Sequence, residues 1–307
     1  MTTIRGFIAA AIAASALGVS ALVAAPDTQR TFASPEDAVR ALADAVKAEK
    51  LDEVMAIFGP ESQALVAASD PATGHRNREV FIVAFKEGWR LVDQAPNHKV
   101  LVIGNESWPF PVPLLNEGSK WRFDTAAGKE EVIARRIGQN ELAVIQTSHA
   151  YVNAQHRYAQ DGHDGKPAGL FATKFRSDQG RQNGLFWPAA HGQKLSPLGD
   201  LVADAAAEGR PLDKPAPPAP FHGYYFRILA AQGPKAAGGA KSYLVNGEMS
   251  DGFAMVAWPS QYDATGVMTF VVNQDGIVRQ KDLGPETSKI VGAMTQFNPD
   301  ASWIEVK

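Results

Sequence analysis

The longest helical pattern in this 307-residue chain runs between Gly128 and Gly162. At 1.5 Å per residue, an uninterrupted helix of about 30 residues would be about 45 Å long. Gly138 is the candidate break. The chain changes character on either side of this pattern, which predicts an α+β protein with an N-terminal unit over 26–128 and a second unit over 129–307. The apolar residues that carry the pattern are Val132, Ile133, Ile137, Leu142, Ile145 and Val152.

The residues before this pattern predict helices followed by an antiparallel meander, the order found in cystatin-like folds. Ser34 is suited to cap a helix that starts at Pro35, with Asp37 as the acidic residue three positions on. A further helix is predicted over Arg78–Trp89. Three strands follow, and alternate prolines restrict the second to an edge strand or an extended segment. They are expected over Lys99–Gly104, Trp108–Leu114 and Lys120–Asp124.

The residues after the pattern predict a C-terminal antiparallel sheet. Asn273-Gln274-Asp275-Gly276 is typical of a hairpin turn. Residues 162–200 are glycine-rich and polar. The five prolines between Pro211 and Pro220 predict a stiff connector or a pinned surface loop. Strands are expected over Gly223–Leu229, Ser242–Val245, Phe253–Trp258, Val267–Val272 and Ile277–Gln280, before a short helix from Gly284 to Met294.

Residues 1–25 have the pattern of a secretory signal peptide. Arg5 precedes an uncharged run from Gly6 to Pro26, and small residues place the cleavage site after Ala21 or near Ala24–Ala25. The alternative is a membrane anchor, but the run is rich in Ala, Gly and Ser rather than Leu. The sequence therefore predicts a periplasmic or secreted protein of the bacterial envelope, with no stable membrane span in the mature chain.

Composition excludes several kinds of site and partner. The chain has no cysteine, which rules out disulfides, thiol nucleophiles, thiolate metal sites and a lipoprotein anchor. Its 30 basic and 33 acidic residues give a formal charge of −3. This balance provides no general attraction to nucleic acid, so no nucleic-acid partner is predicted.

Four phrases of the sequence, Gly138–Gln146, Phe221–Phe226, Val256–Pro259 and Val271–Gly276, together resemble the bacterial exported family of domain-of-unknown-function 2950. The likeness runs from about Phe32 to the C-terminus. It implies an exported protein, but it brings no activity with it, so no catalytic residue is carried over.

The second half is also similar, more weakly, to a type IV pilin headpiece. Asn140-Glu141 leads a helical run, antiparallel strands follow, and Asp275-Gly276 marks a late hairpin. The segment before that run, Lys129–Arg136, is charged where a pilin carries an apolar assembly helix. A filament held together by bundled apolar helices is therefore not expected.

The sequence contains no motif for catalysis, cofactor binding or metal binding, so no such site is predicted. His149 and His156 share a helical face but are too far apart along it to chelate one ion. Asp161–Lys166 has the carboxylates of a calcium loop but lacks its alternating ligands and distal glutamate, which favours an ordinary polar turn. No G-x-S-x-G elbow, Walker loop or dinucleotide-binding loop occurs.

A group of aromatic and imidazole residues near expected strand ends is the candidate ligand surface. Such rings offer flat contact area with polar edges to a carbohydrate or peptide. The alternative is that the same rings fill the core of a small β-rich unit. The candidates are Trp187, His191, His222, Tyr224, Tyr225 and Trp258, with Phe221 beside them.

These observations predict a non-catalytic binding or accessory module whose partner is an envelope protein or a cell-wall glycan. The competing hypothesis is an envelope hydrolase whose residues are scattered in sequence. A cavity holding a histidine hydrogen-bonded to Asp, Glu or Ser would favour the hydrolase. A surface without such an arrangement would favour binding.

Overall fold

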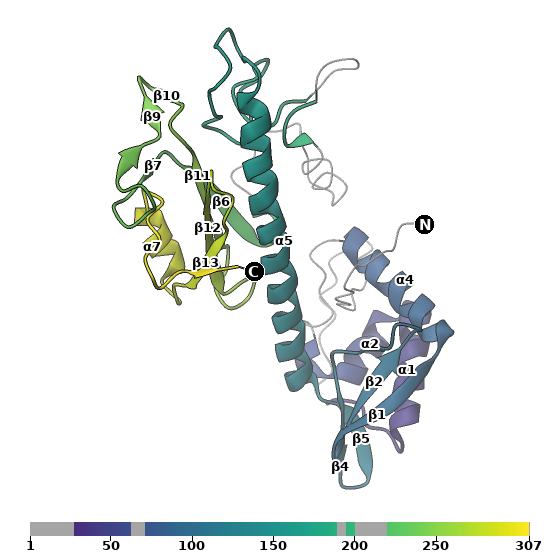
Figure 1. The fold of residues 1–307 in the computed structure, drawn as a ribbon. Coiled ribbons are helices and arrows are strands. Elements are labelled where there is room, and N and C mark those ends of the chain that lie inside the picture. Colours follow the sequence, from purple (N-terminus) through teal and green to yellow (C-terminus); the bar gives the residue numbers. More distant parts are fainter. Residues whose placement is uncertain (1–27, 63–70, 189–194, 200–219, 307) are drawn as a thin grey trace. The chain divides into compact units, whose positions relative to one another are not determined.

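The computed structural model describes residues 28–62, 71–188, 195–199 and 220–306, and in these the chain combines helices with antiparallel sheets (Figure 1). The predicted α+β class is confirmed. The predicted signal peptide, His191 and most of the proline-rich connector lie outside the described residues. Two compact units divide at Arg135/Arg136, inside a helix that the prediction used as the start of the second unit.

In the described part of the first unit, helices α1, α2 and α4 lie against an antiparallel sheet. Its strands pair in the order β1-β2-β4-β5, with β3 on β2, and α1 and α2 contact β5 while α4 contacts β2. The elements are α1 (Pro35–Lys47), α2 (Leu51–Phe58), the 3-10 turn η1 (Pro60–Ser62), α4 (Pro71–Glu87), β1 (Trp89–Ala95), β2 (His98–Ile103), β3 (Trp108–Pro109), β4 (Leu114–Glu117) and β5 (Lys120–Phe123).

The local sequence explains where most helices and strands of this unit begin and end. The Ser34 hydroxyl accepts a hydrogen bond from the Asp37 amide at 3.1 Å, which is the predicted helix cap. The buried face of α1 joins Phe58, Phe110 and Phe123 in one aromatic and aliphatic core. The prediction of a helix reaching Trp89 is wrong at its end, because Trp89 begins β1. This strand lies at the sheet edge and most of its side chains are exposed, so it lacks the apolar alternation of a buried strand.

Helix α5 (Thr125–Ala159) runs without a break through Gly138 and enters the second unit. Among the described helices, none combines the length and the apolar character that a membrane crossing requires. Downstream lie β6 (Tyr224–Leu229), β7 (Ala231–Gln232), β8 (Lys241–Ser242), β9 (Leu244–Val245), β10 (Glu248–Met249), β11 (Ala254–Pro259), β12 (Met268–Asn273), β13 (Arg279–Asp282), α7 (Thr287–Ala293) and β14 (Ile304–Glu305).

The main sheet of the second unit lies between α5 and α7 (Figure 1). Its strands pair antiparallel in the order β14-β13-β12-β11-β6. The Tyr151 hydroxyl on α5 donates to the Ala254 carbonyl at 3.2 Å, and Arg227 on the other face donates to the Met294 carbonyl at the end of α7 at 2.6 Å. The predicted single strand over 242–245 is instead two short strands on either side of the buried Tyr243.

Candidate functional site

The aromatic residues singled out from the sequence occupy different environments. Tyr225 and Trp258 face each other across β6 and β11, with ring centroids 5.7 Å apart, and both are half-buried. Trp187 is buried in the core and lies 5.5 Å from the His163 ring. His222 occupies a tight turn at positive φ, beside Phe221. Among the described candidates, the structure therefore forms two separate ring pairs, Tyr225 with Trp258 and Phe221 with His222, and a ligand role for these residues stays a prediction.

Tyr224 has a clear structural role. It is fully buried, and its hydroxyl donates to the Met268 carbonyl at 2.9 Å. Glu141 of α5 accepts hydrogen bonds from the Val267 and Met268 amides at 2.9 Å each and lies 3.4 Å from the same hydroxyl. Burial and this neighbouring carboxylate raise the pKa of Tyr224 above its usual range. Tyr224 thus locks β6, α5 and the start of β12 together.

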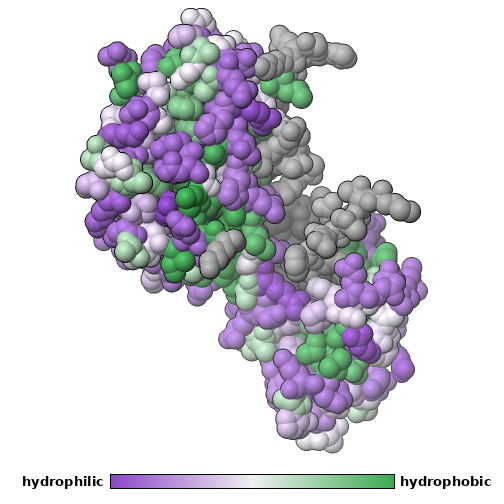
Figure 2. All heavy atoms as spheres, viewed as in Figure 1, coloured by the Kyte–Doolittle hydropathy of each residue, from purple (hydrophilic) through white to green (hydrophobic). Residues whose placement is uncertain are grey.

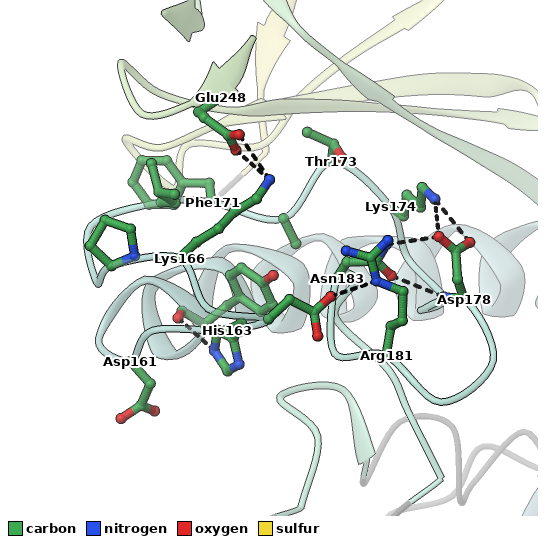
Figure 3. Close-up of a pocket in the computed structure, with 15 residues that line it drawn as sticks. Asp161, His163, Lys166, Phe171, Thr173, Lys174, Asp178, Arg181, Asn183 and Glu248 are labelled. Atoms are coloured by element: carbon green, nitrogen blue, oxygen red, sulfur yellow. Dashed lines mark hydrogen bonds and ion pairs between the residues drawn. The ribbon is translucent and has the colours of Figure 1, made fainter. Parts of the chain in front are cut away.

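A charged cavity lies elsewhere in the second unit, at the C-terminal end of α5. Its volume is about 250 Å³, and its wall comes from the loop after α5, the turn around Arg181 and strand β10. Three cationic and four carboxylate side chains line it. Figure 3 shows Lys166 and Glu248 together on one side, with Lys174, Asp178 and Arg181 on the other.

The loop beside α5 folds as a tight turn. Asp164 and Gly165 both have positive φ, and the Lys166 amide donates to the His163 carbonyl at 2.9 Å. This geometry explains the Asp-Gly pair in the sequence. Among the described residues, no three His, Asp or Glu side chains are placed to hold one metal ion.

Asp164 ties this loop to the turn around Arg181. Its two carboxylate oxygens accept from the Gln182 amide and from Arg181 Nε, each at 3.0 Å. The Gln182 hydrogen bond, with Arg181 beside it, holds the pKa of Asp164 below its usual range. The Asp164 side chain is only 16% exposed and is therefore the fixed member of this pair, whereas the Arg181 side chain is 53% exposed.

Asp178 organises the far side of the cavity. It accepts from Lys174 Nζ at 2.7 Å and from the Asn183 side-chain amide at 2.8 Å, while Asn183 in turn accepts from the Asp178 backbone amide at 3.0 Å. The Lys174 and Asn183 contacts lower the pKa of the Asp178 carboxyl. The side chains at this end are therefore held in one arrangement before any ligand arrives.

The remaining ion pair, between Lys166 and Glu248, differs from the other two because, within the described residues, neither side chain makes a further hydrogen bond. Lys166 Nζ lies 2.8 Å from both Glu248 oxygens, yet the two side chains are 51% and 42% exposed. Lys166 lies in the loop after α5 and Glu248 in β10. The ion pair therefore links this loop to β10. A backbone hydrogen bond nearby links the same two segments, since the Phe171 amide donates to the Met249 carbonyl at 2.7 Å.

Tyr158 and His163 form the aromatic floor of the cavity. Their rings stack with centroids 4.1 Å apart, and the Tyr158 hydroxyl donates to the Gln182 carbonyl at 3.0 Å. Burial, with the charge of Asp164 nearby, raises the pKa of Tyr158 to about 12. Tyr158 is therefore a neutral hydrogen-bonding group at neutral pH, and not a base.

His163 makes no hydrogen bond to an acidic side chain. Its Nε2 lies 3.0 Å from the Tyr158 carbonyl oxygen, which only accepts, so Nε2 carries the hydrogen. Its buried Nδ1 has no hydrogen-bond partner. In the first unit, His98 Nε2 lies 4.0 Å from Asp124, beyond hydrogen-bonding distance. Neither histidine has the geometry of an activated base.

Residues 29–306 match the model of a family described as a protein of unknown function, DUF2950. The chain belongs to the DUF2950 family. Neither the curated proteins nor the solved structures gave a match.

Two of the DUF2950-like sequence segments contact each other in the structure. Asn140 and Glu141 come from the phrase in α5, and Tyr224 from the phrase that begins at Phe221. The Asn140 side chain also donates to the Thr265 carbonyl at 2.8 Å. Within this family member, therefore, these phrases describe how α5 packs on the sheet.

The weak likeness to pilin headpieces has no support from the comparisons and stays a prediction. Asn140-Glu141 lies inside α5, which begins at Thr125, and not at the start of a helix. Leu142 is the large apolar side chain that α5 exposes within the described residues, and Figure 2 shows hydrophilic side chains over most of the visible face of each unit.

Sequence analysis found the loop that holds Asp164 but missed its partners. Arg181, Asp178 and Glu248 belong to no motif, and Lys166 and Glu248 are 82 residues apart. The one available signal was the density of charged and glycine residues over 161–184, which predicted a polar loop but not what it encloses.

Proposed function

We propose that this DUF2950 protein is exported to the bacterial envelope and acts there as a non-catalytic binding module, with the charged cavity of its second unit as the ligand site. Export is supported by the basic start, apolar run and small residues of 1–25. The ligand site is supported by a concave wall that combines fixed charges with an aromatic floor.

The observation that carries binding over catalysis is how the polar groups of the wall are used. The Lys166, Lys174 and Arg181 cations each pair with a carboxylate of the same wall. His163, the histidine of the cavity, is engaged through Nε2 with a carbonyl, and its Nδ1 is buried. This arrangement recognises charge and hydrogen-bonding pattern but offers no poised proton acceptor.

The test is a thermal-shift screen of the mature protein against metals, glycans and cell-wall fragments. A ligand at 100 times its Kd should add about 2.7 kcal/mol of stability, because it binds only the folded state. The same ligand should shift an Arg181→Gln variant much less, and a Lys289→Gln variant normally, since Lys289 pairs with Glu286 on α7. Hydrolysis of a fragment during incubation, or a shift that Arg181→Gln leaves intact, would overturn the proposal.

Export has its own test. The chain is expressed in full in a bacterial host and followed by cell fractionation and N-terminal sequencing. We expect the mature protein outside the cytoplasm, beginning after Ala21 or near Ala24–Ala25. A full-length protein retained in the cytoplasm would contradict this part of the proposal.

A further inference from the structure

The cavity wall carries charges of both signs, and each of its three cations pairs with a carboxylate of the same wall. Lys166 pairs with Glu248 at 2.8 Å, Lys174 with Asp178 at 2.7 Å, and Arg181 with Asp164 at 3.0 Å. Figure 3 shows Lys166 and Glu248 on one side, with Lys174, Asp178 and Arg181 on the other. An entering ligand therefore meets both signs at close range, and not a field of one sign.

The three pairs differ in how readily they can open. Asp164 is held by a backbone amide in addition to Arg181, and Asp178 is held by Asn183 in addition to Lys174. Within the described part of the chain, neither the Lys166 nor the Glu248 side chain makes a further hydrogen bond, although this pair is about as exposed as the pair of Lys174 and Asp178. Exposed ion pairs of this kind contribute little to stability, so this pair is the one that a ligand can separate.

Separation by a singly charged ligand has a cost. An anion that took Lys166 would leave Glu248 without its partner, and a cation that took Glu248 would do the same to Lys166. A ligand with an ammonium and a carboxylate satisfies both side chains at once. Its carboxylate accepts from Lys166 Nζ, and its ammonium donates to Glu248.

We propose that the cavity binds a small zwitterion, an amino acid or short peptide with a free amine and a free carboxylate, inserted between Lys166 and Glu248. This inference rests on the proposed binding function and names its ligand class. The volume of about 250 Å³ is near the lower end of the roughly 300–1,000 Å³ usual for small-molecule sites, which suits such a ligand better than a glycan strand. Phe171 and Leu170 of the wall offer apolar contact to a short side chain.

The test is calorimetric titration with four probes, so that charge is varied at nearly constant size. They are alanyl-alanine in its L,L and D,D forms, its N-acetyl derivative, which is anionic, and its C-terminal amide, which is cationic. At least one stereoisomer of the zwitterion should bind about tenfold or more tightly than either blocked dipeptide, because each block removes one charge-assisted contact.

Variants assign the contacts. Lys166→Gln should weaken binding of the zwitterion about tenfold but strengthen binding of the cationic amide, which no longer has to separate an ion pair to reach Glu248. By the same reasoning, Glu248→Gln should weaken binding of the zwitterion and strengthen binding of the anionic N-acetyl derivative. The exchanged pair Lys166→Glu with Glu248→Lys retains both charges and should restore binding. Lys235→Gln is the matched control and should leave binding unchanged. It removes an exposed lysine that pairs with Asp300 and does not line the cavity.

The possible outcomes distinguish the zwitterion proposal from the proposed binding function on which it rests. A blocked dipeptide that binds as tightly as the zwitterion, or Lys166→Gln without effect, overturns the zwitterion and leaves the binding module standing. The zwitterion is likewise ruled out, and the binding module stands, if no dipeptide binds but another compound of the screen raises the Tm of the wild type and not that of Arg181→Gln. If no dipeptide and no compound of the screen binds, both proposals are wrong.

Discussion

Asp164 is the residue through which the two loops of the cavity are joined. Its carboxylate accepts from the Gln182 amide and from Arg181, and its pKa is lowered in the folded state. The unfolded chain has the ordinary value of about 3.9. Ionised Asp164 therefore stabilises the fold above that pH, and this contribution is lost as the pH falls through the lower, folded-state pKa.

Replacing Asp164 with Asn should make stability less sensitive to acid. We expect Asp164→Asn to lower the free energy of unfolding by about 1 kcal/mol at pH 7, because a charge-assisted hydrogen bond becomes weaker. Between pH 5 and pH 2 the wild type should lose more stability than the variant. Urea unfolding at several pH values measures both, with the exposed Asp44→Asn on α1 as control. Parallel pH profiles for wild type and Asp164→Asn would contradict the expectation.

Gly266 is a second residue whose identity the structure requires. A Cβ at this position would lie 1.9 Å from the Tyr224 hydroxyl oxygen, and Tyr224 is fully buried. Gly266→Ala should therefore destabilise the protein by about 1–3 kcal/mol, the range of an overpacked core. Chemical denaturation measures the change. Gly292→Ala on α7 is the matched control, since its Cβ would meet nothing within 4 Å. Equal stability of the two variants would show that Tyr224 moves aside freely.

At the scale of elements, α5 shows that the local sequence pattern predicted the helix but not whether it continues through Gly138. The 3.6-residue spacing of its apolar residues predicted the helix, and it continues through Gly138 for all its 35 residues. A single glycine costs about 1 kcal/mol relative to alanine in a helix, which packing of α5 on both cores readily offsets. Glycine inside a strong helical pattern therefore weakens a helix without ending it.

Two glycines of α5 should respond in opposite ways to alanine. At Gly138 nothing lies within 4 Å of a new Cβ, so Gly138→Ala should stabilise the protein by about 0.5–1 kcal/mol. At Gly128 the Cβ would lie 2.7 Å from the buried Val112, so Gly128→Ala should destabilise it by about 1–3 kcal/mol. Denaturant midpoints of the two variants measure this contrast. Destabilisation by Gly138→Ala would mean that α5 is contacted at that position.

The elements that sequence predicted well are those whose buried side chains are neighbours in the chain. β11 and β12 are almost continuously apolar, and Asn273–Gly276 turns β12 toward β13, as its composition indicates. β1 escaped prediction because an exposed edge strand has little apolar pattern. The cavity escaped for a different reason, since its contacts join residues that only the tertiary fold brings together, such as Lys166 and Glu248.

At the scale of the whole molecule, the described residues form two hydrophobic cores. The clusters around Leu42 and around Val256 share no side chain among the described residues. Helix α5 supplies Val132 to the first and Val144 and Tyr151 to the second. Separate cores predict separate cooperative units, because each buries its own apolar surface and gains its own stability.

Calorimetry of the intact chain should therefore show two unfolding transitions that respond to different substitutions. Leu42 is fully buried in the first core, and Leu42→Ala should cost about 2–5 kcal/mol there, lowering one Tm by roughly 10 °C or more. Leu229→Ala, in the second core, should lower the other Tm instead. Because the cavity belongs to the second unit, ligand binding should then be lost at a lower temperature. Ligand binding should raise only this second transition. A single transition that both substitutions shift alike would mean that α5 couples the two cores into one cooperative unit.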